Sequence, residues 1–428
     1  MFQHISDIVE EYKPRLADGE LRRKLGAIGA VLITGPKWCG KTTTAERIAK
    51  SAIYLHDADM REAYQRTLKV KPSLLLEGEK PRLIDEWQTA PILWDAVRYS
   101  VDRSSEAGQF ILTGSTTVNE SKILHSGAGR IGRMRMHTMS LYESGDSTGD
   151  VSLRSMFEGN EVSGVSPLSI EDVAALIVRG GWPGSLGKSL LDAQVLTESY
   201  CETILRSEVK TVDGVDRDSD KMRQVLRSLS RNVSTQTPDT TIMADMSAKD
   251  NAPIHINTLK AYEKTLREIY VIEDLPAWTP KLRSKTSVRT SDTRHLTDPA
   301  IAAYFLGATP KGLFADLKTF GLLFESMVVR DMRVYAQSAG GNVYHYRDGD
   351  GTEADAVIQL RDGRWGAVEV KLGSGMIDEA AENLLKIKNK IESESLGEMS
   401  FLAVVTASGY AYTREDGVHV VPAGCLKD

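Results

Sequence analysis

The chain has 428 residues, of which 41% are hydrophobic and 26% charged, a globular composition that excludes the disordered and fibrous classes. At ~100 to 200 residues per domain, this length predicts two to four domains. The net charge of −6 argues against indiscriminate coating of nucleic acid, and no stretch approaches the ~18 apolar residues of a membrane span. The acidic N-terminus does not resemble a secretory signal, and three cysteines are too few for a disulfide framework, so we expect a cytoplasmic protein with no membrane partner.

Residues 1–150 are predicted to form a parallel α/β domain. Apolar runs with β-branched residues alternate here with helical periods, which is typical of a parallel sheet. A polar stretch, Ser144–Asp150, is the predicted linker that ends the domain. The predicted elements are an opening helix, Phe2–Lys24, and strands at Ala30–Thr34, Ser51–His56, Arg82–Asp85 and Gln109–Thr113, with helices between them.

A phosphate-binding motif follows the first strand. It matches G-x-x-x-x-G-K-[ST], and it lies where the motif requires, after a strand and before a predicted helix at Thr43–Ser51. Backbone N–H groups of such a loop surround the phosphates, and the helix N-terminus adds its positive dipole end. We predict that Lys41 binds the β- and γ-phosphates of ATP and that the Thr42 hydroxyl binds Mg²⁺. The predicted nucleotide-binding residues are Gly35, Pro36, Lys37, Trp38, Cys39, Gly40, Lys41, Thr42 and Thr43.

Two acidic residues end the strand at Arg82–Asp85, where open α/β sheets bind ligands. Asp85 is predicted to hold Mg²⁺, directly or through water, and Glu86 to polarise the attacking water. The next apolar strand ends in hydroxyl residues, and we expect Ser115 to sense the γ-phosphate, with Thr113 as the second candidate. Together with the loop lysine, Glu86 and Ser115 are candidate catalytic residues.

Two arginines follow in a glycine-rich segment, Gly127–Arg133. Arg130, or else Arg133, is a candidate arginine finger, which neutralises transition-state charge either within its own chain or across a subunit interface. The interface alternative implies a homo-oligomer. The other interpretation is a structural arginine that bonds loop carbonyls.

Residues 151–309 are predicted to form a helical and winged-helix region. Helical periods span Ser199–Lys210, Asp220–Arg231 and Ile256–Ile269, and the last has the apolar spacing and basic outer face of a recognition helix. Residues 247–250, Ser-Ala-Lys-Asp, would suit its start. Residues 221–295 contain 13 Lys and Arg against 8 Asp and Glu, an excess of +5. This segment is either a DNA-facing surface or a solvated helical domain, and such a module serves protein contacts equally well.

Residues 310–428 are predicted to form a mixed α/β domain with a nuclease-like set of carboxylates. Asp355, Glu369 and Lys371 fit the pattern D…E-x-K, with Glu325 available from the preceding helix. Such carboxylates hold Mg²⁺ against a scissile phosphate, and the lysine positions or activates water. The alternative is a solvated strand face without cleavage. The predicted elements are a helix at Leu313–Ala336 and strands at Asn342–Arg347, Ala354–Leu360, Trp365–Lys371 and Ser400–Thr406.

The connection between two of these strands decides whether Asp355 joins the set. Glu369 and Lys371 are two residues apart, so they share a strand face. A two-residue hairpin loop would place Asp355 on the wrong face, whereas a three-residue loop, 361–363, pairs it with Glu369. The site therefore requires the odd loop, with Gly363 in the left-handed region, or a bulge.

A family resemblance runs through nearly the whole chain. The segments that carry it are GPKWCGKTTT, LIDEWQTAP, FILTGST and GAGRIGRM, with VEVKLG and VVTASGYAYTREDGVHVVP downstream. They resemble bacterial and archaeal AAA-superfamily ATPases that end in a restriction-endonuclease-like domain of unknown function. The resemblance implies an AAA-type ATPase core, a winged-helix middle and a nuclease-like end. By similarity, the residues that match the nucleotide site of the family, and so imply ATP and Mg²⁺, are Lys41, Thr42, Asp85, Glu86 and Arg130.

Three functions are compatible with the sequence. The first is Mg-dependent ATP hydrolysis that drives a conformational or assembly change, with DNA as a candidate partner. The second is an ATP-gated, metal-dependent nuclease, and the third is a nucleotide-responsive DNA- or protein-binding module with little turnover. Glu86 favours the first over the third, because a pure switch has less need of a water-polarising acid. The loop at 361–363 decides whether the second is geometrically open.

Overall fold

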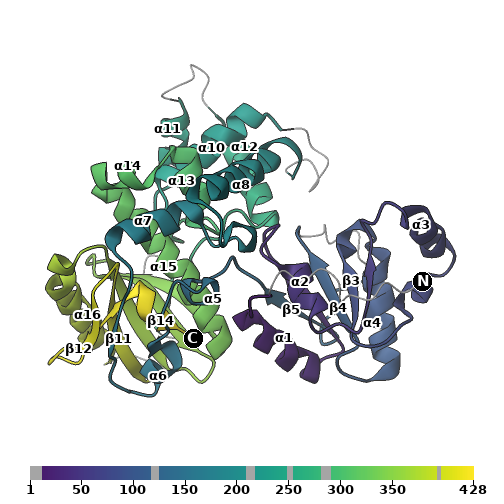
Figure 1. Cartoon of the computed structure of the whole chain (residues 1–428), viewed down its shortest axis with the longest axis horizontal. Coiled ribbons are helices and arrows are strands. Elements are labelled where there is room, and N and C mark those ends of the chain that lie inside the picture. Colours follow the sequence, from purple (N-terminus) through teal and green to yellow (C-terminus); the bar gives the residue numbers. More distant parts are fainter. Residues whose placement is uncertain (1–11, 117–124, 209–216, 248–253, 281–290, 393–396) are drawn as a thin grey trace. The chain divides into compact units, whose positions relative to one another are not determined.

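The computed structural model describes residues 12–116, 125–208, 217–247, 254–280, 291–392 and 397–428. The chain divides into two compact units, the first ending at His137 and the second beginning at Thr138 (Figure 1). A short later segment, residues 268–270, groups with the first unit. None of the helices within the described ranges is long and apolar enough to cross a membrane.

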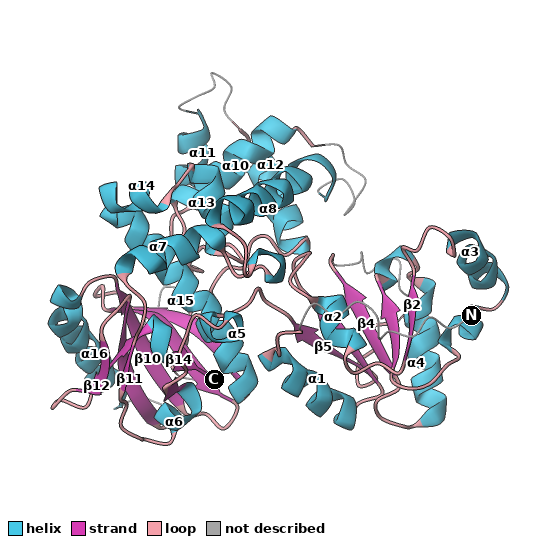
Figure 2. Ribbon diagram, in the orientation of Figure 1, coloured by secondary structure: helices cyan, strands magenta, loops and turns pink. Residues whose placement is uncertain are grey.

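The first unit is built around a parallel sheet (Figure 2). This sheet has five strands in the order β2-β3-β4-β1-β5. Because all neighbours run parallel, the carboxyl ends of the strands meet at one edge. Its strands are mostly apolar and buried on both faces, as parallel sheets covered by helices require. The elements are α1 (Leu16–Ala27), β1 (Ala30–Thr34), α2 (Lys41–Glu46), β2 (Ser51–Tyr54), α3 (Arg61–Val70), β3 (Arg82–Asp85), α4 (Ile92–Ser104), β4 (Phe110–Gly114) and β5 (Ile131–Arg135).

The four predicted strands of this unit are confirmed, but the helix boundaries differ. The opening helix begins at Leu16, where Asp18 accepts a hydrogen bond from the Arg15 N–H, and the predicted part before residue 12 lies outside the described residues. Helix α2 begins and ends earlier than predicted, since Ser51 already belongs to β2. The sequence analysis missed β5, an edge strand that is only partly buried and contains a glycine and two arginines.

Helices dominate the start of the second unit. The apolar helix α13 contacts α7, α8, α10 and α15 and forms their common core. The helix predicted from Ser199 is the end of α8, which passes into a π-helical turn, and its last two predicted residues lie outside the described ranges. The elements are α5 (Leu141–Ser144), α6 (Leu153–Phe157), α7 (Ile170–Arg179), α8 (Leu190–Thr203), the turn Ile204–Glu208, α10 (Ser219–Arg231), α11 (Asp239–Ser247), α12 (Ile256–Glu268), α13 (Pro299–Leu306) and α14 (Pro310–Ala315).

The predicted linker Ser144–Asp150 is packed against the second unit. Arg179 pairs with Asp146 at 2.6 Å, and the Ser147 hydroxyl donates to the carbonyl oxygen of Leu426 at 2.7 Å. The boundary between the two units therefore falls earlier, after His137.

The helices predicted at Asp220–Arg231 and Ile256–Ile269 are confirmed as α10 and α12. Extended segments after α12 form isolated antiparallel bridges, Ile272 with Leu296 and Leu275 with Thr293. Of the predicted helix start at 247–250, only Ser247 is described, and it ends α11. The winged-helix assignment of this arrangement remains a prediction.

The second unit ends in a seven-stranded sheet of order β7-β12-β13-β11-β10-β9-β8. Helix α15 contacts β8, β9 and β10, and α16 packs its apolar side chains on β9, β10 and β11. Strand β7 comes from the region predicted to be helical. The elements are β6 (Val151–Ser152), β7 (Gly164–Val165), α15 (Leu317–Ala339), β8 (Gly341–Arg347), β9 (Glu353–Leu360), β10 (Trp365–Lys371), α16 (Ile377–Glu392), β11 (Met399–Thr406), β12 (Tyr410–Thr413), β13 (His419–Pro422) and β14 (Leu426–Lys427).

The β9–β10 hairpin has the three-residue loop that the carboxylate set requires. Val368 pairs with Ala356, and the Leu360 N–H donates to the carbonyl oxygen of Arg364, which leaves 361–363 as the loop. Gly363 has a φ of 94°, in the left-handed region that favours glycine. The ladder ends at Val368 and Ala356, and the next residues along the two strands in this register are Glu369 and Asp355.

Candidate nucleotide site and carboxylate cluster

The phosphate-binding loop follows the carboxyl end of β1, which is an interior strand of the sheet. A Cβ atom at Gly35 would lie 2.1 Å from the carbonyl oxygen of Met136, so any other residue would displace the backbone. Lys41 opens α2 and is 5% exposed. Its Nζ donates hydrogen bonds to the carbonyl oxygens of Gly35 at 3.0 Å and Pro36 at 2.7 Å. The ammonium group is thus held against its own loop.

A hydroxyl and a carboxylate converge beside this loop. The Thr42 hydroxyl donates to Oδ1 of Asp85 at 2.8 Å, and the Thr113 hydroxyl donates to the same oxygen at 2.5 Å. Asp85 is 2% exposed, and Nδ1 of His56 lies 3.4 Å from its Oδ2. Hydroxyl and carboxylate oxygens are hard ligands of the kind that Mg²⁺ prefers, so Thr42 and Asp85 fit a magnesium site.

Glu86 follows Asp85 with its backbone in the left-handed region, at a φ of 53°. This conformation costs a residue with a Cβ atom roughly 1 to 2 kcal/mol. The Glu86 Oε2 atom accepts hydrogen bonds from the Ser115 hydroxyl at 3.2 Å and from Nε2 of Gln88. The predicted water-polarising acid and the predicted sensor therefore form one hydrogen-bonded group. Ser115 is 2% exposed, so this group is shielded from solvent on its side.

The other predicted loop residues differ in exposure. Cys39 is fully buried and its Sγ lies 3.7 Å from the Met136 carbonyl oxygen, so its side chain belongs to the core. Trp38 is 51% exposed, Thr43 is exposed and Lys37 is partly exposed. In loops of this type the backbone N–H groups are the main phosphate ligands. Because the Cys39 side chain is buried in the core, it does not cover its own backbone N–H.

Arg130 lies at the opposite edge of the sheet from the loop. Its carbonyl oxygen accepts a hydrogen bond from the Ala30 N–H at the start of β1, and its guanidinium pairs with Asp102. The five residues of β1, at ~3.3 Å each, separate the two edges by roughly 16 Å. An arginine side chain does not span that distance, which corrects the same-chain alternative for Arg130. A role across a subunit interface stays a prediction.

Strands β9 and β10 and helix α15 bring the four residues of the carboxylate set together. Lys371 Nζ donates to Oε2 of Glu369 at 2.6 Å, and Nδ2 of Asn383 in α16 donates to Oε1 at 2.5 Å. Asp355 Oδ2 accepts a backbone N–H of β10 at 2.7 Å. Glu325 lies close enough that the charges of Asp355, Lys371 and Glu369 all act on its ionisation. We call these four residues the carboxylate cluster.

Burial raises the pKa of all three carboxyls in the cluster. It is the largest cause for Glu325, Asp355 and Glu369, and the charge of Asp355 is the next largest for the two glutamates. Burial alone would lower the pKa of Lys371, but Asp355 and Glu369 raise it to about 12. The lysine is therefore the internal counter-ion of the cluster.

The cluster is not arranged as a metal site. Over the described part of the chain, no three His, Cys, Asp or Glu side chains are placed to hold a metal ion. In the cluster, both carboxylate oxygens of Glu369 already accept hydrogen bonds, one from Lys371 and one from Asn383. A cation here would have to take the place of the lysine at Glu369.

Three family models match separate parts of the chain: an AAA domain at residues 28–144, and two domains of unknown function, DUF8612 at residues 170–312 and DUF4143 at residues 320–426. The uncharacterised proteins Rv2008c of Mycobacterium tuberculosis and Mb2031c of Mycobacterium bovis are each 23% identical to this chain over 413 residues, which is 96% of it and 83% of each relative.

Two solved structures are also similar. The Walker-type ATPase PABY2304 of Pyrococcus abyssi has 15% identity and a TM-score of 0.42, with 69% of this chain and 96% of that chain covered. The replication initiator DnaA, bound to AMPPCP and single-stranded DNA, has 16% identity and a TM-score of 0.27, with 61% and 90% covered.

The AAA match covers the parallel sheet and all the residues that converge at its carboxyl edge. The first unit has an AAA-type P-loop ATPase fold. The match to DUF4143 covers the carboxylate cluster without assigning it an activity, so the nuclease-like character of the second unit remains a prediction.

Sequence reasoning missed three polar residues of these two sites: His56, Gln88 and Asn383. His56 ends a predicted strand, and this position at the carboxyl edge is the signal that would have identified it. Gln88 lies two residues after Glu86, in a turn whose conformation the sequence does not show. Asn383 lies on α16, and only the packing of that helix on β10 brings it to Glu369.

Proposed function

We propose that the first unit binds Mg-ATP and hydrolyses it. The observation that carries this proposal is the convergence of Lys41, Thr42, Asp85, Glu86 and Ser115 at one sheet edge of an AAA-type fold. Backbone N–H groups of the loop would hold the phosphates. The oxygens of the β- and γ-phosphates would replace the Gly35 and Pro36 carbonyls as acceptors for Lys41.

In this mechanism Glu86 accepts the proton of the attacking water. The water oxygen bonds to the γ-phosphorus as the bond to the bridging β–γ oxygen breaks, so the products are ADP and phosphate. Ser115, which already donates to Glu86, would report the γ-phosphate to that carboxylate. Thr42 and Asp85 would hold Mg²⁺, which neutralises charge on the phosphates.

The variant Glu86→Gln tests the assignment. It preserves shape and removes the base, so nucleotide binding should persist while phosphate release falls by ~10² or more. Unchanged turnover would give Glu86 a structural role. A wild-type rate too low to be reduced would instead support the binding module with little turnover.

The second candidate function is metal-dependent cleavage of nucleic acid by the carboxylate cluster. It is favoured by one observation: the odd loop at 361–363 and the β9–β10 register bring Asp355 to Glu369 and Lys371. On this proposal Asp355 and Glu369 would hold Mg²⁺ or Mn²⁺, which would supply a Lewis acid at the scissile phosphate, and Lys371 would position water once it no longer donates to Glu369. Incubation of DNA and RNA with Mn²⁺ tests it, because Asp355→Ala and Lys371→Ala should each abolish cleavage and leave ATP turnover unchanged. Cleavage that survives in both variants would come from elsewhere.

DNA is the proposed partner of the region around α12. Lys260 and Lys264 lie exposed on one side of this helix, one turn apart. Arg267, a turn further on, and Arg294 are instead bonded to Asp274, Asp239 and Glu263. These acids offset the positive charge of the two arginines, so the local charge excess overstates the positive charge that this part of the described chain presents to phosphates. Loss of DNA binding in Lys260→Ala with Lys264→Ala, and its weakening by salt, would support this surface.

A further inference from the structure

A buried arginine outside the nucleotide motifs reaches the phosphate-binding loop. Arg15 precedes α1 and is 7% exposed. One of its guanidinium nitrogens donates to the carbonyl oxygen of Cys39 at 2.7 Å, and the other donates to the carbonyl oxygen of His137 at 3.0 Å. A planar guanidinium is suited to such a bridge, because its N–H groups have a fixed fork geometry. Arg15 therefore joins the loop to His137, the last residue of the N-terminal segment of the first unit.

The residues around Arg15 hold it in this place. Its backbone N–H donates to Asp18, and the same carboxylate accepts the Tyr12 hydroxyl at 2.7 Å. The Tyr12 hydroxyl also lies 3.2 Å from the buried hydroxyl of Thr44 in α2. The segment before α1 thus contacts both the phosphate-binding loop and helix α2, which follows the loop.

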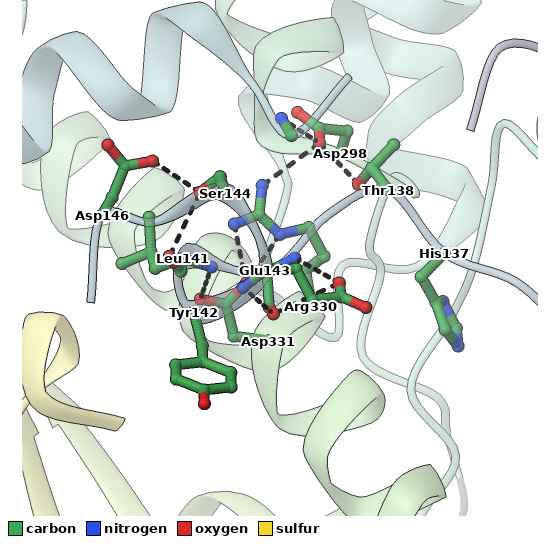
Figure 3. Close-up of polar contacts among 12 residues, drawn as sticks. His137, Thr138, Leu141, Tyr142, Glu143, Ser144, Asp146, Asp298, Arg330 and Asp331 are labelled. Carbon is green, nitrogen blue, oxygen red and sulfur yellow. Dashed lines mark hydrogen bonds and ion pairs between the residues drawn. The ribbon is translucent and has the colours of Figure 1, made fainter. Parts of the chain in front are cut away.

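The chain is anchored again one residue after His137, now within the second unit (Figure 3). The Thr138 hydroxyl donates to Asp298 at 2.7 Å, and the Leu141 N–H donates to Asp331 at 3.0 Å. Arg330 lies between these acids and donates to Asp331 at 2.7 Å and to Asp298 at 3.2 Å. Helix α15, which supplies Arg330 and Asp331, also carries Glu325.

We propose that Arg15 is a positioning residue of the nucleotide site, which fixes the Cys39 carbonyl of the loop to the His137 carbonyl and so links nucleotide binding to the segment 138–141. This inference rests on the proposed ATP binding. When the loop shifts around bound phosphates, the Cys39 carbonyl would move Arg15, and Arg15 would move the His137 carbonyl. Because His137 is bonded to Thr138, that movement would reach the anchored segment 138–141. By linkage, a change in the segment alters nucleotide affinity equally.

Equilibrium binding of Mg-ATP to the full-length chain tests the positioning role. Arg15→Ala should weaken binding roughly tenfold, because the Cys39 carbonyl loses its charged hydrogen-bond donor and the loop is no longer held to His137. Arg15→Lys keeps the charge but has a single ammonium group in place of the fork, so it should restore binding only in part. Arg22→Ala, which removes an exposed arginine of α1, should bind like the wild type. Wild-type affinity in a folded Arg15→Ala or Arg15→Lys variant would overturn the role.

Amide hydrogen exchange tests the link. The amides of Met139 and Leu141 donate to Gly181 and Asp331, so they report the anchored segment. Mg-ATP should change their exchange rates in the wild type and in Arg22→Ala, and not in Arg15→Ala at saturating nucleotide. An unchanged rate in the wild type, or an equal change in Arg15→Ala, overturns the link. Failure of the wild type to bind ATP at all, with Lys41→Ala as its reference, would refute the proposed function and is distinguishable from both outcomes.

Discussion

The nucleotide site and the carboxylate cluster use the same residue types in different ways. Each contains carboxylates and one lysine, brought together by strands and a helix. In the nucleotide site the lysine is bonded to backbone carbonyls, and the acids accept hydrogen bonds mainly from neutral groups. In the cluster Lys371 is bonded to Glu369 itself. The first site keeps positive and negative groups apart, as a ligand with both phosphates and a cation requires, whereas the second neutralises its own charge.

Substitution of the two lysines gives the largest contrast. Lys41→Ala should lower Mg-ATP affinity by ~10² or more with the fold intact, because Lys41 is the buried ammonium group of the loop whereas Lys37 is partly exposed. Lys371→Ala should leave ATP affinity unchanged. Titration with a fluorescent ATP analogue measures both. Equal affinity of Lys41→Ala and the wild type would refute the nucleotide assignment, and a loss in Lys371→Ala would break the separation of the two sites.

Mixing two inactive variants tests whether Arg130 serves a neighbouring chain. Arginine fingers contribute ~10³ or more to turnover, so Arg130→Ala should be strongly impaired if it acts across an interface. Mixed with Lys41→Ala chains, it should regain part of the hydrolysis, because some interfaces then join an intact loop to an intact arginine. Arg133→Ala is the matched comparison. No recovery in a preparation shown to contain mixed oligomers would leave Arg130 with its Asp102 pair as a structural residue.

The second candidate function requires that a divalent cation can replace Lys371 as the counter-ion of the cluster, and such a cation should then stabilise the folded chain more than cations on an ordinary acidic surface do. A cation bound only by the folded chain adds about 4 kcal/mol to the free energy of unfolding at a thousandfold excess over its Kd. We expect Mn²⁺, without nucleotide, to raise the unfolding midpoint of the Lys41→Ala chain, and not that of the same chain carrying Asp355→Ala. The control Glu379→Gln removes an exposed acid of α16. Equal shifts in all three would assign the effect to the general surface.

The parts of this structure that could be predicted from sequence are those formed by residues close together in the chain. The phosphate loop is one unbroken run of residues, and so is β3, so each could be recognised by itself. The conformation of the hairpin loop 361–363 depends only on residues next to each other in sequence, among them Gly363. The position of Arg130 required the strand order, since β5 lies beside β1 and begins at the far edge. Arg15 and His137 are 122 residues apart in sequence, and their contact is formed through a backbone carbonyl. No side-chain pattern records such a contact.

The anchor of the segment 138–141 should have a small, measurable pH dependence. Burial raises the pKa of Asp331 to about 6 from its usual 3.8, although the Arg330 guanidinium and the Leu141 N–H oppose this. Because the folded pKa lies above the unfolded one, the contribution of this group to stability is complete below about pH 3.8 and is lost as the pH rises to about 6. The loss is about 3 kcal/mol at most, at 1.36 kcal/mol per pKa unit. Denaturant unfolding of the wild type and Asp331→Asn measures it: the free energy of unfolding of the wild type should fall relative to that of the variant over this range and stay constant relative to it above the range. Glu198→Gln, at an exposed site on α8, should show no such trend relative to the wild type. A difference between wild type and Asp331→Asn that is constant from pH 4 to 7 would mean that the Arg330 guanidinium keeps Asp331 ionised throughout this range.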